Sequence, residues 1–535
     1  MKMNSILKAG LSAAAIALMS ASASATVYYV SDCQAGAAAG CVAGNDANNG
    51  TSPATPWKTV SKASSMIGSL LAGDEVRFAR GASFSAARLQ IYNTRSRAAT
   101  PLVFDSYKPS WGTGTQKPIL MAPTGAQAVQ FEDSGNADHD EGYVVRNLDL
   151  RGSGSSIGVF IYNDADYITL ENLDISGFAI GVNCSESNAA NAGSNARNDY
   201  ITLRNSNIHD NKDIGYLGGC ANVLVENNRF DNNGFGGGTM INRNHNIYIS
   251  TEGTNVVVRG NTLTRSAVSG GVCGGVPIVA HGKQVGLVIE NNVIDETTGA
   301  GPGCYGIQVN PGYGSIAESF TGAIIRGNKV INPGTIGIAV GSCPSCVIEN
   351  NFIVKETSGL FVGIAMPSEN IEVGVDAADT NLTVRNNSIY VTSPTYGSQG
   401  IRTETYGTGH KVVSNMVVFG SAASGTSCFS TKGLTLASFT AFDNNLCYST
   451  GGVAYSATYS KLADAQAAGF DRNGQFKDPL LVAVPSAANG YSMKATATSP
   501  LLNTGNTLYS VISGTSNIGA YDRTPPSPPP TVSIK

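Results

Sequence analysis

The sequence predicts an all-β solenoid, a parallel β-helix in which short strands stack as successive coils, and two observations lead to it. One apolar phrase recurs nine times, as VRNLDL, LENLDI, LRNSNI, VENNRF, VRGNTL, IENNVI, IRGNKV, IENNFI and VRNNSI, at a period of roughly 22 to 36 residues. Such a period with one strand per unit is typical of repeat proteins. The charged residue of the phrase also alternates strictly: Arg146, Glu171, Arg204, Glu226, Arg259, Glu290, Arg326, Glu349 and Arg385.

The alternation of charge indicates how the coils are stacked. Parallel strands in register place equivalent residues about 4.8 Å apart. Like charges repel at that spacing and opposite charges attract, so the alternation is explained by one continuous ladder. We therefore interpret the nine charged residues as structural and exclude them from the catalytic candidates. The asparagines beside them are predicted to stack their amides in a tight turn with left-handed backbone: Asn147, Asn172, Asn227, Asn291, Asn350 and Asn386.

Along the chain, the composition separates into five segments. A basic start, an apolar run and the Ala-Ser-Ala site that ends at Ala25 predict a signal peptide over residues 1–25, so we expect a secreted protein, extracellular or periplasmic. Residues 26–523 are predicted to form one β-helix domain. The domain comprises an N-terminal cap region (26–122), the coils (142–420) and a C-terminal closing region of irregular strands (421–523). Residues 524–535 are predicted to form a proline-rich tail.

The N-terminal cap region predicts a helix. A solenoid has two open apolar ends, and the helical stretch from Lys58 to Leu71, after a strand from Val27 to Val30, is suited to cover one of them.

The charge of the chain bears on whether its partner is a nucleic acid or a membrane. The formal charge is -4 and 13% of the residues are charged, which gives no reason to expect nucleic acid or a membrane surface as partner. No apolar run after the signal peptide reaches the ~20 residues of a membrane span. We expect a monomer.

Ten cysteines, an even number, suit an oxidising compartment. Sequence alone does not fix their pairing, but short local loops favour Cys33–Cys41, Cys184–Cys220, Cys273–Cys304, Cys343–Cys346 and Cys428–Cys447. The Cys343–Cys346 pair has a redox or metal half-site as its alternative, yet no second pair or nearby histidine completes a ligand set.

The opening GNDANNGTSPATPWKTVSKA and GDEVRFARG, the Asn-rich coils, and the closing KDPLL, SPLLNTG and IGAYDR resemble the secreted right-handed parallel β-helix proteins of bacteria. That superfamily includes polysaccharide lyases, glycoside hydrolases and uronate epimerases, besides surface proteins of unknown role. The resemblance is specific for the fold. The Asp-Pro-His-Glu motif of alginate epimerases and the paired aspartates with Gly-His-Gly of polygalacturonases do not occur, so the reaction must be argued from the site.

The candidate site lies on a second strand that recurs in each coil, as GVFIYN, IGVNC, NIYIS, PIVAH, GIQVN, GIAVG, GIAMP and GIRTE. Its isoleucines align as an inward stack, so alternate residues point outward. Polar and aromatic outward residues concentrate in the middle coils, where a groove is expected to hold a sugar chain. The resemblance also implies this sheet, because β-helix lyases and hydrolases generally use it.

We predict the catalytic residues from the needs of a lyase, which removes the proton at C5 of a uronate, neutralises its carboxylate and protonates the leaving oxygen. His281 or Lys283 is the candidate base, Tyr248 the acid, and Arg243 or Arg265 the carboxylate neutraliser. Candidate substrate-binding residues are His245, Arg265, Gln308, Asn310, Tyr162 and Tyr305. The alternatives are that His281 is solvated surface, that Tyr248 fills a strand or stacks on sugar, and that His245 is a turn residue bonded to the backbone. His209 and Asp210 are read as an ordinary turn.

Hydrolysis needs two carboxyl groups about 5 to 9.5 Å apart. Asp164, Asp166 and Glu252 remain near the groove, but Asp166 looks like a repeated turn residue. Asp164 and Glu252 are expected several coils apart.

No cofactor is certain. Calcium could use Asp46 with Asn48 and Asn49, or Asp138 with Asp140 and Glu141, although neither set matches a defined calcium loop.

The sequence therefore predicts a secreted polysaccharide lyase that cleaves a uronic-acid polymer by β-elimination. A glycoside hydrolase on the same scaffold is one alternative, and a non-catalytic glycan-binding surface or matrix protein is the other.

Overall fold

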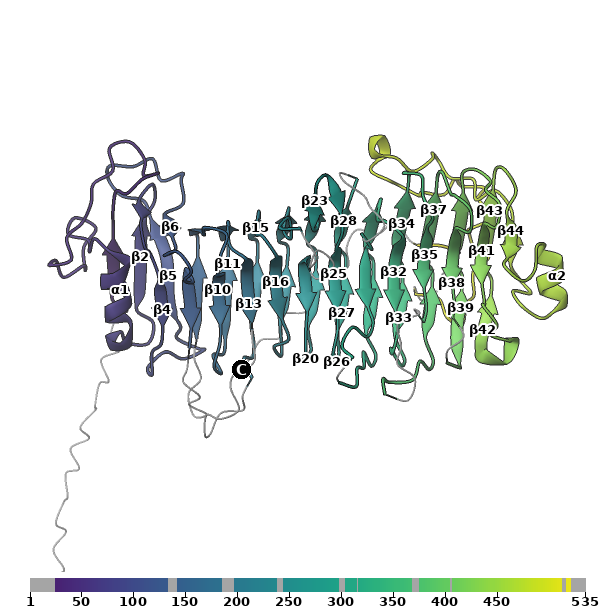
Figure 1. Ribbon diagram of the computed structural model, residues 1–535, viewed down its shortest axis with the longest axis horizontal. Coiled ribbons are helices and arrows are strands. Elements are labelled where there is room, and N and C mark those ends of the chain that lie inside the picture. The colour runs from purple at the N-terminus through teal and green to yellow at the C-terminus, as the bar shows by residue number, and fades with distance from the viewer. Residues whose placement is uncertain are drawn as a thin grey trace, which may run out of the picture.

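The computed structural model describes residues 25–132, 142–184, 197–237, 244–297, 304–314, 316–367, 375–404, 407–511 and 516–520. Within these ranges the chain winds into successive coils whose strands form three long parallel sheets (Figure 1). Sheet A holds the strands of the repeated phrase, in the order β1 Val27–Val30, β2 Glu75–Ala79, β5 Leu102–Tyr107, β8 Tyr143–Arg146, β11 Ile168–Glu171, β14 Thr202–Arg204, β17 Leu224–Glu226, β21 Val257–Arg259, β27 Val288–Glu290, β30 Ile324–Arg326, β33 Val347–Glu349, β36 Thr383–Arg385, β39 His410–Val413 and β42 Phe439–Asp443.

Sheets B and C complete each coil. Sheet B consists of β3 Ser83–Phe84, β6 Ile119–Met121, β9 Asp149–Arg151, β12 Asp174–Ser176, β15 Asn207–His209, β18 Arg229–Asp231, β22 Thr262–Thr264, β28 Val293–Asp295, β31 Lys329–Ile331, β34 Phe352–Lys355, β37 Ser388–Val391, β40 Met416–Phe419, β43 Leu446–Ser449 and β45 Gln475–Phe476. Sheet C consists of β4 Leu89–Ile91, β7 Val129–Phe131, β10 Ile157–Ile161, β13 Ile180–Cys184, β16 Ile214–Gly218, β19 His245–Ile249, β25 Val276–Ala280, β29 Ile307–Val309, β32 Ile336–Val340, β35 Val362–Ala365, β38 Gln399–Arg402, β41 Ser427–Ser430 and β44 Ala454–Ser456.

Two small sheets lie outside this pattern. A parallel pair joins β20 Glu252–Thr254 to β26 Lys283–Val285. An antiparallel pair joins β23 Val268–Ser269 to β24 Val272–Cys273.

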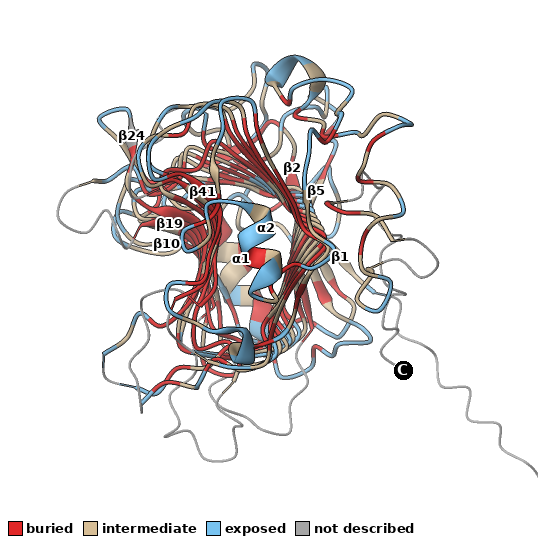
Figure 2. Cartoon of the chain, turned by 90° about the vertical axis from the view of Figure 1, so that its right-hand side faces the viewer, coloured by how far each residue is buried: buried red, intermediate tan, exposed pale blue. Residues whose placement is uncertain are grey.

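Strand pairing confirms the parallel β-helix. Leu170 is in parallel register with Val145 of the preceding coil and Leu203 of the following one, and all three side chains are fully buried. The view along the solenoid in Figure 2 shows the buried residues on the strands that enclose its interior. Alternate inward side chains thus build one continuous apolar core.

The charge ladder on sheet A is confirmed as well. Strand register brings each arginine of the phrase beside a glutamate. Each bonded pair joins an arginine to the carboxylate of the preceding coil: Arg204–Glu171 at 3.0 Å, Arg259–Glu226 at 2.8 Å, Arg326–Glu290 at 2.7 Å and Arg385–Glu349 at 2.6 Å. Arg146 binds Asp105 at 2.7 Å. The nine charged residues of the phrase are therefore occupied with stacking.

The turn after sheet A carries two asparagine positions. The predicted left-handed backbone is confirmed at the outer one: φ is 62° at Asn147, 49° at Asn172, 54° at Asn227, 56° at Asn291, 55° at Asn350 and 51° at Asn386. The inner position forms a buried ladder of Asn228, Asn261, Asn292, Asn328, Asn351, Asn387, Asn415 and Asn445. In that ladder each Oδ1 accepts the backbone N–H and the amide of the preceding asparagine, as Asn351 does from Asn328 at 3.0 Å in both bonds.

The inner ladder ends on a carboxyl group. Asn445 donates its backbone N–H to Asp471 Oδ1 at 3.0 Å, and the Tyr455 hydroxyl donates to the other carboxyl oxygen. Asp471 is fully buried, and burial raises its pKa to about 7. An aspartate thus closes the row of amides where no further coil follows.

Helices lie at both ends of the solenoid (Figure 1). Helix α1 (Val60–Met66) continues as a short 3₁₀ turn, Ile67–Ser69, within the predicted helical stretch, and buries Val60, Ala63 and Ile67. Helix α2 (Leu462–Ala467) lies at the opposite end and buries Ala465. Two further 3₁₀ turns, Leu436–Ser438 and Ala487–Asn489, belong to the C-terminal region.

The sheets extend past the predicted coil range of 142–420 at both ends, from β1 to β45. After β45 the chain returns along sheet B. Its Tyr491, Met493, Leu501 and Ile518 pack on outward apolar side chains of that sheet: Ile331, Val354, Tyr390, Met416, Val418 and Leu446. The closing region therefore adds coils and covers a side of the solenoid.

All five predicted cysteine pairs are present as disulfides: Cys33–Cys41, Cys184–Cys220, Cys273–Cys304, Cys343–Cys346 and Cys428–Cys447. Five bridges suit an oxidising compartment. Among the residues that the structure describes, no helix has the length and apolarity needed to cross a membrane.

Candidate functional site

The outward face of sheet C changes from coil to coil. One position, followed by strand register, holds Gln130, Phe160, Asn183, Leu217, Tyr248, Val279, Gln308, Ala339, Ala365, Arg402 and Ser430. The residues that follow these strands, among them Tyr162, His281 and Asn310, extend the same face. Residues able to transfer protons or bind sugar hydroxyls lie on three adjacent coils: Tyr248 on β19, His281 directly after β25, and Gln308 on β29.

An imidazole and two phenols form the centre of this face. The ring centroids of Tyr248 and His281 are 5.6 Å apart, and those of His281 and Tyr313 are 5.8 Å apart, both edge to face. The hydroxyl oxygens of Tyr248 and Tyr313 are hydrogen-bonded at 2.7 Å. We call Tyr248, His281 and Tyr313 the Tyr–His–Tyr cluster.

The hydrogen bond of His281 fixes its tautomer. Nδ1 lies 2.6 Å from the carbonyl oxygen of Asn310. Because a carbonyl oxygen only accepts, Nδ1 carries the proton and Nε2 of the neutral ring carries the lone pair. Burial lowers the pKa of His281 below its ordinary value, although the Asn310 bond and the charge of Glu318 act in the opposite direction. The cluster therefore presents a neutral imidazole whose Nε2 can accept a proton.

The turn after β29 holds the His281 ring in place. A Cβ atom built on Gly312 would lie 2.6 Å from Nδ1 and Cε1 of His281, so the ring packs directly on the glycine backbone. Asn310 supplies the carbonyl acceptor, and Tyr313 supplies the edge contact. One short turn, 310–313, thus contributes three of the contacts that orient His281.

His245 lies beside the cluster and is buried. Its ring centroid is 5.2 Å from that of Tyr248. Its Nδ1 lies 3.1 Å from the carbonyl oxygen and 3.2 Å from the amide nitrogen of Val276. Burial lowers the pKa of His245 to about 3. The structure thus places His245 as a neutral residue bonded to backbone, which packs behind Tyr248.

Among the predicted substrate-binding residues, Gln308 and Asn310 lie nearest to the cluster. Gln308 donates its amide N–H to Asn310 Oδ1 at 2.7 Å. Tyr305 is half-buried against a small apolar group on sheet C, which comprises Ile336, Ala339, Val362 and Ala365. Tyr162 stacks on Phe160 with centroids 5.2 Å apart, three coils before Tyr248.

Two of the predicted cations, Lys283 and Arg265, have described positions away from the cluster. Lys283 opens β26 with an exposed side chain, around the turn from His281. Arg265 follows β22 of sheet B and binds Asp231 through Nε at 2.8 Å, so the sequence-based role of Arg265 at the groove has no support in its contacts. Arg243 lies outside the described residues.

The carboxylates weighed for hydrolysis lie in turns between coils and on β20. Asp164 Oδ1 accepts the backbone N–H of Arg197 at 3.2 Å, and Asp166 Oδ1 accepts that of Asp199 at 2.6 Å, so both close turns between coils. Glu252 is exposed on β20, which directly follows β19. Asp164 follows β10, and β19 lies three coils further along the solenoid than β10.

His209 is the last residue of strand β15, and the turn predicted for it and Asp210 begins after it. Its ring lies between Asp174, at 2.9 Å, and Asp210, at 2.6 Å, on sheet B. Hydrogen bonds to both carboxylates raise the pKa of His209 to about 9.

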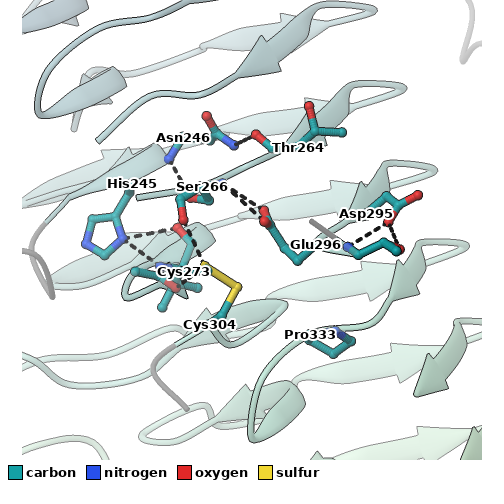
Figure 3. Close-up of a disulfide and its surroundings, with 12 residues drawn as sticks. His245, Asn246, Thr264, Ser266, Cys273, Asp295, Glu296, Cys304 and Pro333 are labelled. Atoms are coloured by element: carbon teal, nitrogen blue, oxygen red, sulfur yellow. Dashed lines mark hydrogen bonds between the residues drawn. A yellow bond between two sulfur atoms is a disulfide. The ribbon is translucent and has the colours of Figure 1, made fainter. Parts of the chain in front are cut away.

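Few described residues could hold a metal. Among them, the single group with suitable spacing is Cys273, Cys304 and Glu296, and its two sulfur atoms are joined in a disulfide (Figure 3). The carboxylate of Asp46 accepts the backbone N–H groups of Lys58 and Thr59 and the Thr59 hydroxyl, so it anchors the start of α1. The second predicted calcium set, Asp138, Asp140 and Glu141, lies outside the described residues.

Sequence reasoning missed Tyr313 and Glu318. Both lie in the 310–323 connection, beyond the strand on which the outward pattern was followed. The dipeptide Pro311-Gly312 signals a turn there, but no sequence pattern indicates that this turn folds back on the coil of His281.

Comparison with known proteins gives a partial match. No family model matches the chain. A stretch of 153 residues, 29% of this chain, is 30% identical to a lacto-N-biosidase of Bifidobacterium longum subsp. longum, of which it spans 8%. Solved structures with similar architecture include a GH136 lacto-N-biosidase from Eubacterium ramulus, with TM-score 0.43, 15% identity, and 78% of this chain and 67% of that chain covered. Pectate lyase Pel9A has TM-score 0.42 and 12% identity, with 94% and 97% covered.

Proposed function

We propose that this protein is an exported carbohydrate-active enzyme that binds a glycan along the outward face of sheet C and hydrolyses a glycosidic bond at the Tyr–His–Tyr cluster. The observation that carries the location is the convergence of a neutral imidazole and a hydrogen-bonded pair of phenols on one face. The observation that favours hydrolysis is the 153-residue stretch that is 30% identical to a lacto-N-biosidase, whose name is that of a glycoside hydrolase.

The cluster offers the two proton-transfer roles that cleavage needs. Nε2 of His281 accepts a proton from the attacking water, and the Tyr248–Tyr313 pair, which shares its two hydroxyl protons, donates one to the leaving glycosidic oxygen. The bond from the anomeric carbon to that oxygen breaks as the bond to water forms. Gln308 and Asn310 place amide groups beside the cluster, where they can bind sugar hydroxyls.

β-Elimination on a uronate polymer is the second candidate, and a specific observation favours it. Hydrolysis usually relies on two facing carboxyl groups, whereas Asp164 and Asp166 accept backbone N–H groups of the next coil and Glu252 lies exposed on β20. In elimination the same base takes the C5 proton, the C4–O bond breaks, and a C4–C5 double bond forms. The protonation of the leaving oxygen is common to both reactions.

The products distinguish the two reactions. The mature protein is incubated with neutral oligosaccharides that end in lacto-N-biose and with uronate polymers. Hydrolysis adds one water to the products and leaves no double bond. Elimination produces an unsaturated uronate, which is detected by the ultraviolet absorbance of its new double bond. If neither product forms but glycan binds, the protein is a binding module and the proposal fails.

A further inference from the structure

Glu318 is a buried carboxylate behind the Tyr–His–Tyr cluster, and its side chain is 1% exposed. It lies within the 310–323 connection, between β29 and β30. The backbone N–H of Glu318 donates to Oδ1 of Asp376 at 2.9 Å. Asp376 lies two coils further along the chain. A charged group held this deeply is stable only when hydrogen bonds replace its hydration.

Three backbone N–H groups supply those bonds. Oε2 accepts from Gly282 at 2.5 Å, and Oε1 accepts from Gly312 at 2.7 Å and from Tyr313 at 2.5 Å. Gly282 follows His281 directly, whereas Gly312 packs against the His281 ring. One carboxylate therefore joins the turn that carries the imidazole to the turn that carries the second phenol.

We propose that Glu318 is the positioning residue of this site, whose carboxylate holds His281 and Tyr313 at the relative geometry that proton transfer requires. This inference rests on the proposed function. Charge-assisted bonds to backbone N–H groups are short and directional. Catalysis is sensitive to such support, because a displacement of about 1 Å can lower the rate about 100-fold.

The chain contains a matched control in Asp379. This carboxylate is also 1% exposed, and it also accepts a backbone N–H from a residue 36 positions earlier, Cys343, at 2.9 Å. The turn that it holds, at Ser342 and Cys343, carries no residue of the cluster. Glu318 and Asp379 are therefore alike in burial and in accepting a backbone N–H from a turn 36 positions earlier. Glu318 accepts two further backbone N–H bonds, and the turns that it joins carry residues of the cluster.

A second readout follows from electrostatics. The charge of Glu318 raises the pKa of His281, while burial lowers it. The other titratable groups whose contacts reach this ring are His245, Tyr248 and Tyr313. Removal of the Glu318 charge should lower the pKa of His281 and move the acid limb of the rate profile to lower pH.

The test compares Glu318→Gln with Asp379→Asn in the full mature protein. We expect Glu318→Gln to lower kcat about 100-fold with little change in KM, and to shift the His281 ring resonances and their titration to lower pH in NMR spectra of histidine-labelled protein. Asp379→Asn, which removes a buried carboxylate away from the cluster, should leave kcat and the His281 titration unchanged. Equal loss of kcat in both variants, or an unmoved His281 titration in Glu318→Gln, would overturn the inference.

Two further variants keep the test decisive. If Glu318→Gln does not fold, Gly312→Ala displaces the His281 ring without a change of charge, and an unchanged kcat in that variant contradicts the positioning role of the turn. If His281→Ala retains full cleavage, the proposed function of the cluster fails. The NMR comparison of Glu318→Gln and Asp379→Asn still decides in that case whether Glu318 positions His281.

Discussion

The outward faces of sheets A and C are built on the same coils and differ in what they repeat. On sheet A, each coil from Arg146 to Arg385 presents an arginine or a glutamate in strict alternation, and the pairs are bonded. On sheet C, the equivalent position changes from an aromatic ring to an amide, an aliphatic chain or a cation.

The difference teaches where to look for function in a solenoid. A residue that recurs at every coil has a neighbour of the same kind about 4.8 Å away, and stacking alone explains its presence. A residue that occurs in a single coil gains nothing from stacking. The Tyr–His–Tyr cluster belongs to the second kind, because the coils on either side place Leu217 and Val279 where it has Tyr248.

The strongest test of this comparison is His281→Ala. The variant removes the base from the unrepeated face, so we expect kcat to fall by about 10²–10⁴-fold while the far-ultraviolet circular dichroism spectrum stays unchanged. The fall in kcat is measured on the substrate that the unchanged protein cleaves, by the release of reducing ends or by the rise in ultraviolet absorbance.

The control for that variant is His209→Ala, which removes an imidazole from sheet B. It should keep kcat close to that of the unchanged protein. A similar loss of kcat in His281→Ala and His209→Ala would indicate a general effect on the fold. The difference between the outward faces of the sheets would then not locate the site.

The repeated part of the molecule can be tested at its end, where Asp471 replaces asparagine. Burial raises the pKa of Asp471 to about 7, above the value of about 3.9 in an unfolded chain. The folded state therefore binds this proton more tightly, and its stabilising effect is present below about pH 4 and lost as the pH rises to 7.

Asp471→Asn should remove that pH dependence, because an amide continues the ladder without a charge. We expect the variant to be more stable than the unchanged protein at pH 8 by roughly 2–4 kcal/mol, with the difference shrinking toward pH 4. Denaturant midpoints at the two pH values measure it. A variant that is less stable at pH 8 would show that the carboxylate is needed in ionised form.

Asn328→Ala tests the middle of the same inner ladder. Asn328 accepts from Asn292 and donates to the Ile289 carbonyl and to Asn351, in bonds of 2.9 to 3.0 Å. Its removal leaves buried donors and acceptors without partners, which costs about 2–3 kcal/mol. We expect a lower denaturant midpoint, and a change below experimental error would mean that water replaces the amide.

Glu349→Gln should have the smallest effect. Glu349 is in register with Arg326 and Arg385 on the partly exposed outer face of sheet A, and it binds Arg385. Such pairs contribute about 0.5 kcal/mol, so we expect a small loss of stability that diminishes as salt is added, with kcat unchanged. A large loss of kcat would contradict the assignment of sheet A to structure alone.

Sequence reasoning located part of the candidate site. The alternation of inward and outward residues on the second strand of each coil placed Tyr248 one coil before His281. The two rings lie in edge-to-face contact. It misplaced Arg265, because the end of β22 belongs to sheet B and Asp231 was available there as a partner. It did not find Glu318, since the groups that this carboxylate binds are backbone N–H groups, which every non-proline residue carries and no sequence pattern distinguishes.

The sequence by itself determined the coil, its parallel stacking, the charge ladder and the cysteine pairs. These features depend on residues that repeat at a regular interval or lie in short loops, so each coil specifies the next. The tertiary structure alone decided that the turn 310–313 packs on His281 and that Glu318 ties the two together. Those contacts join unrepeated connections of unequal length, and their geometry results from the packing of several coils at once.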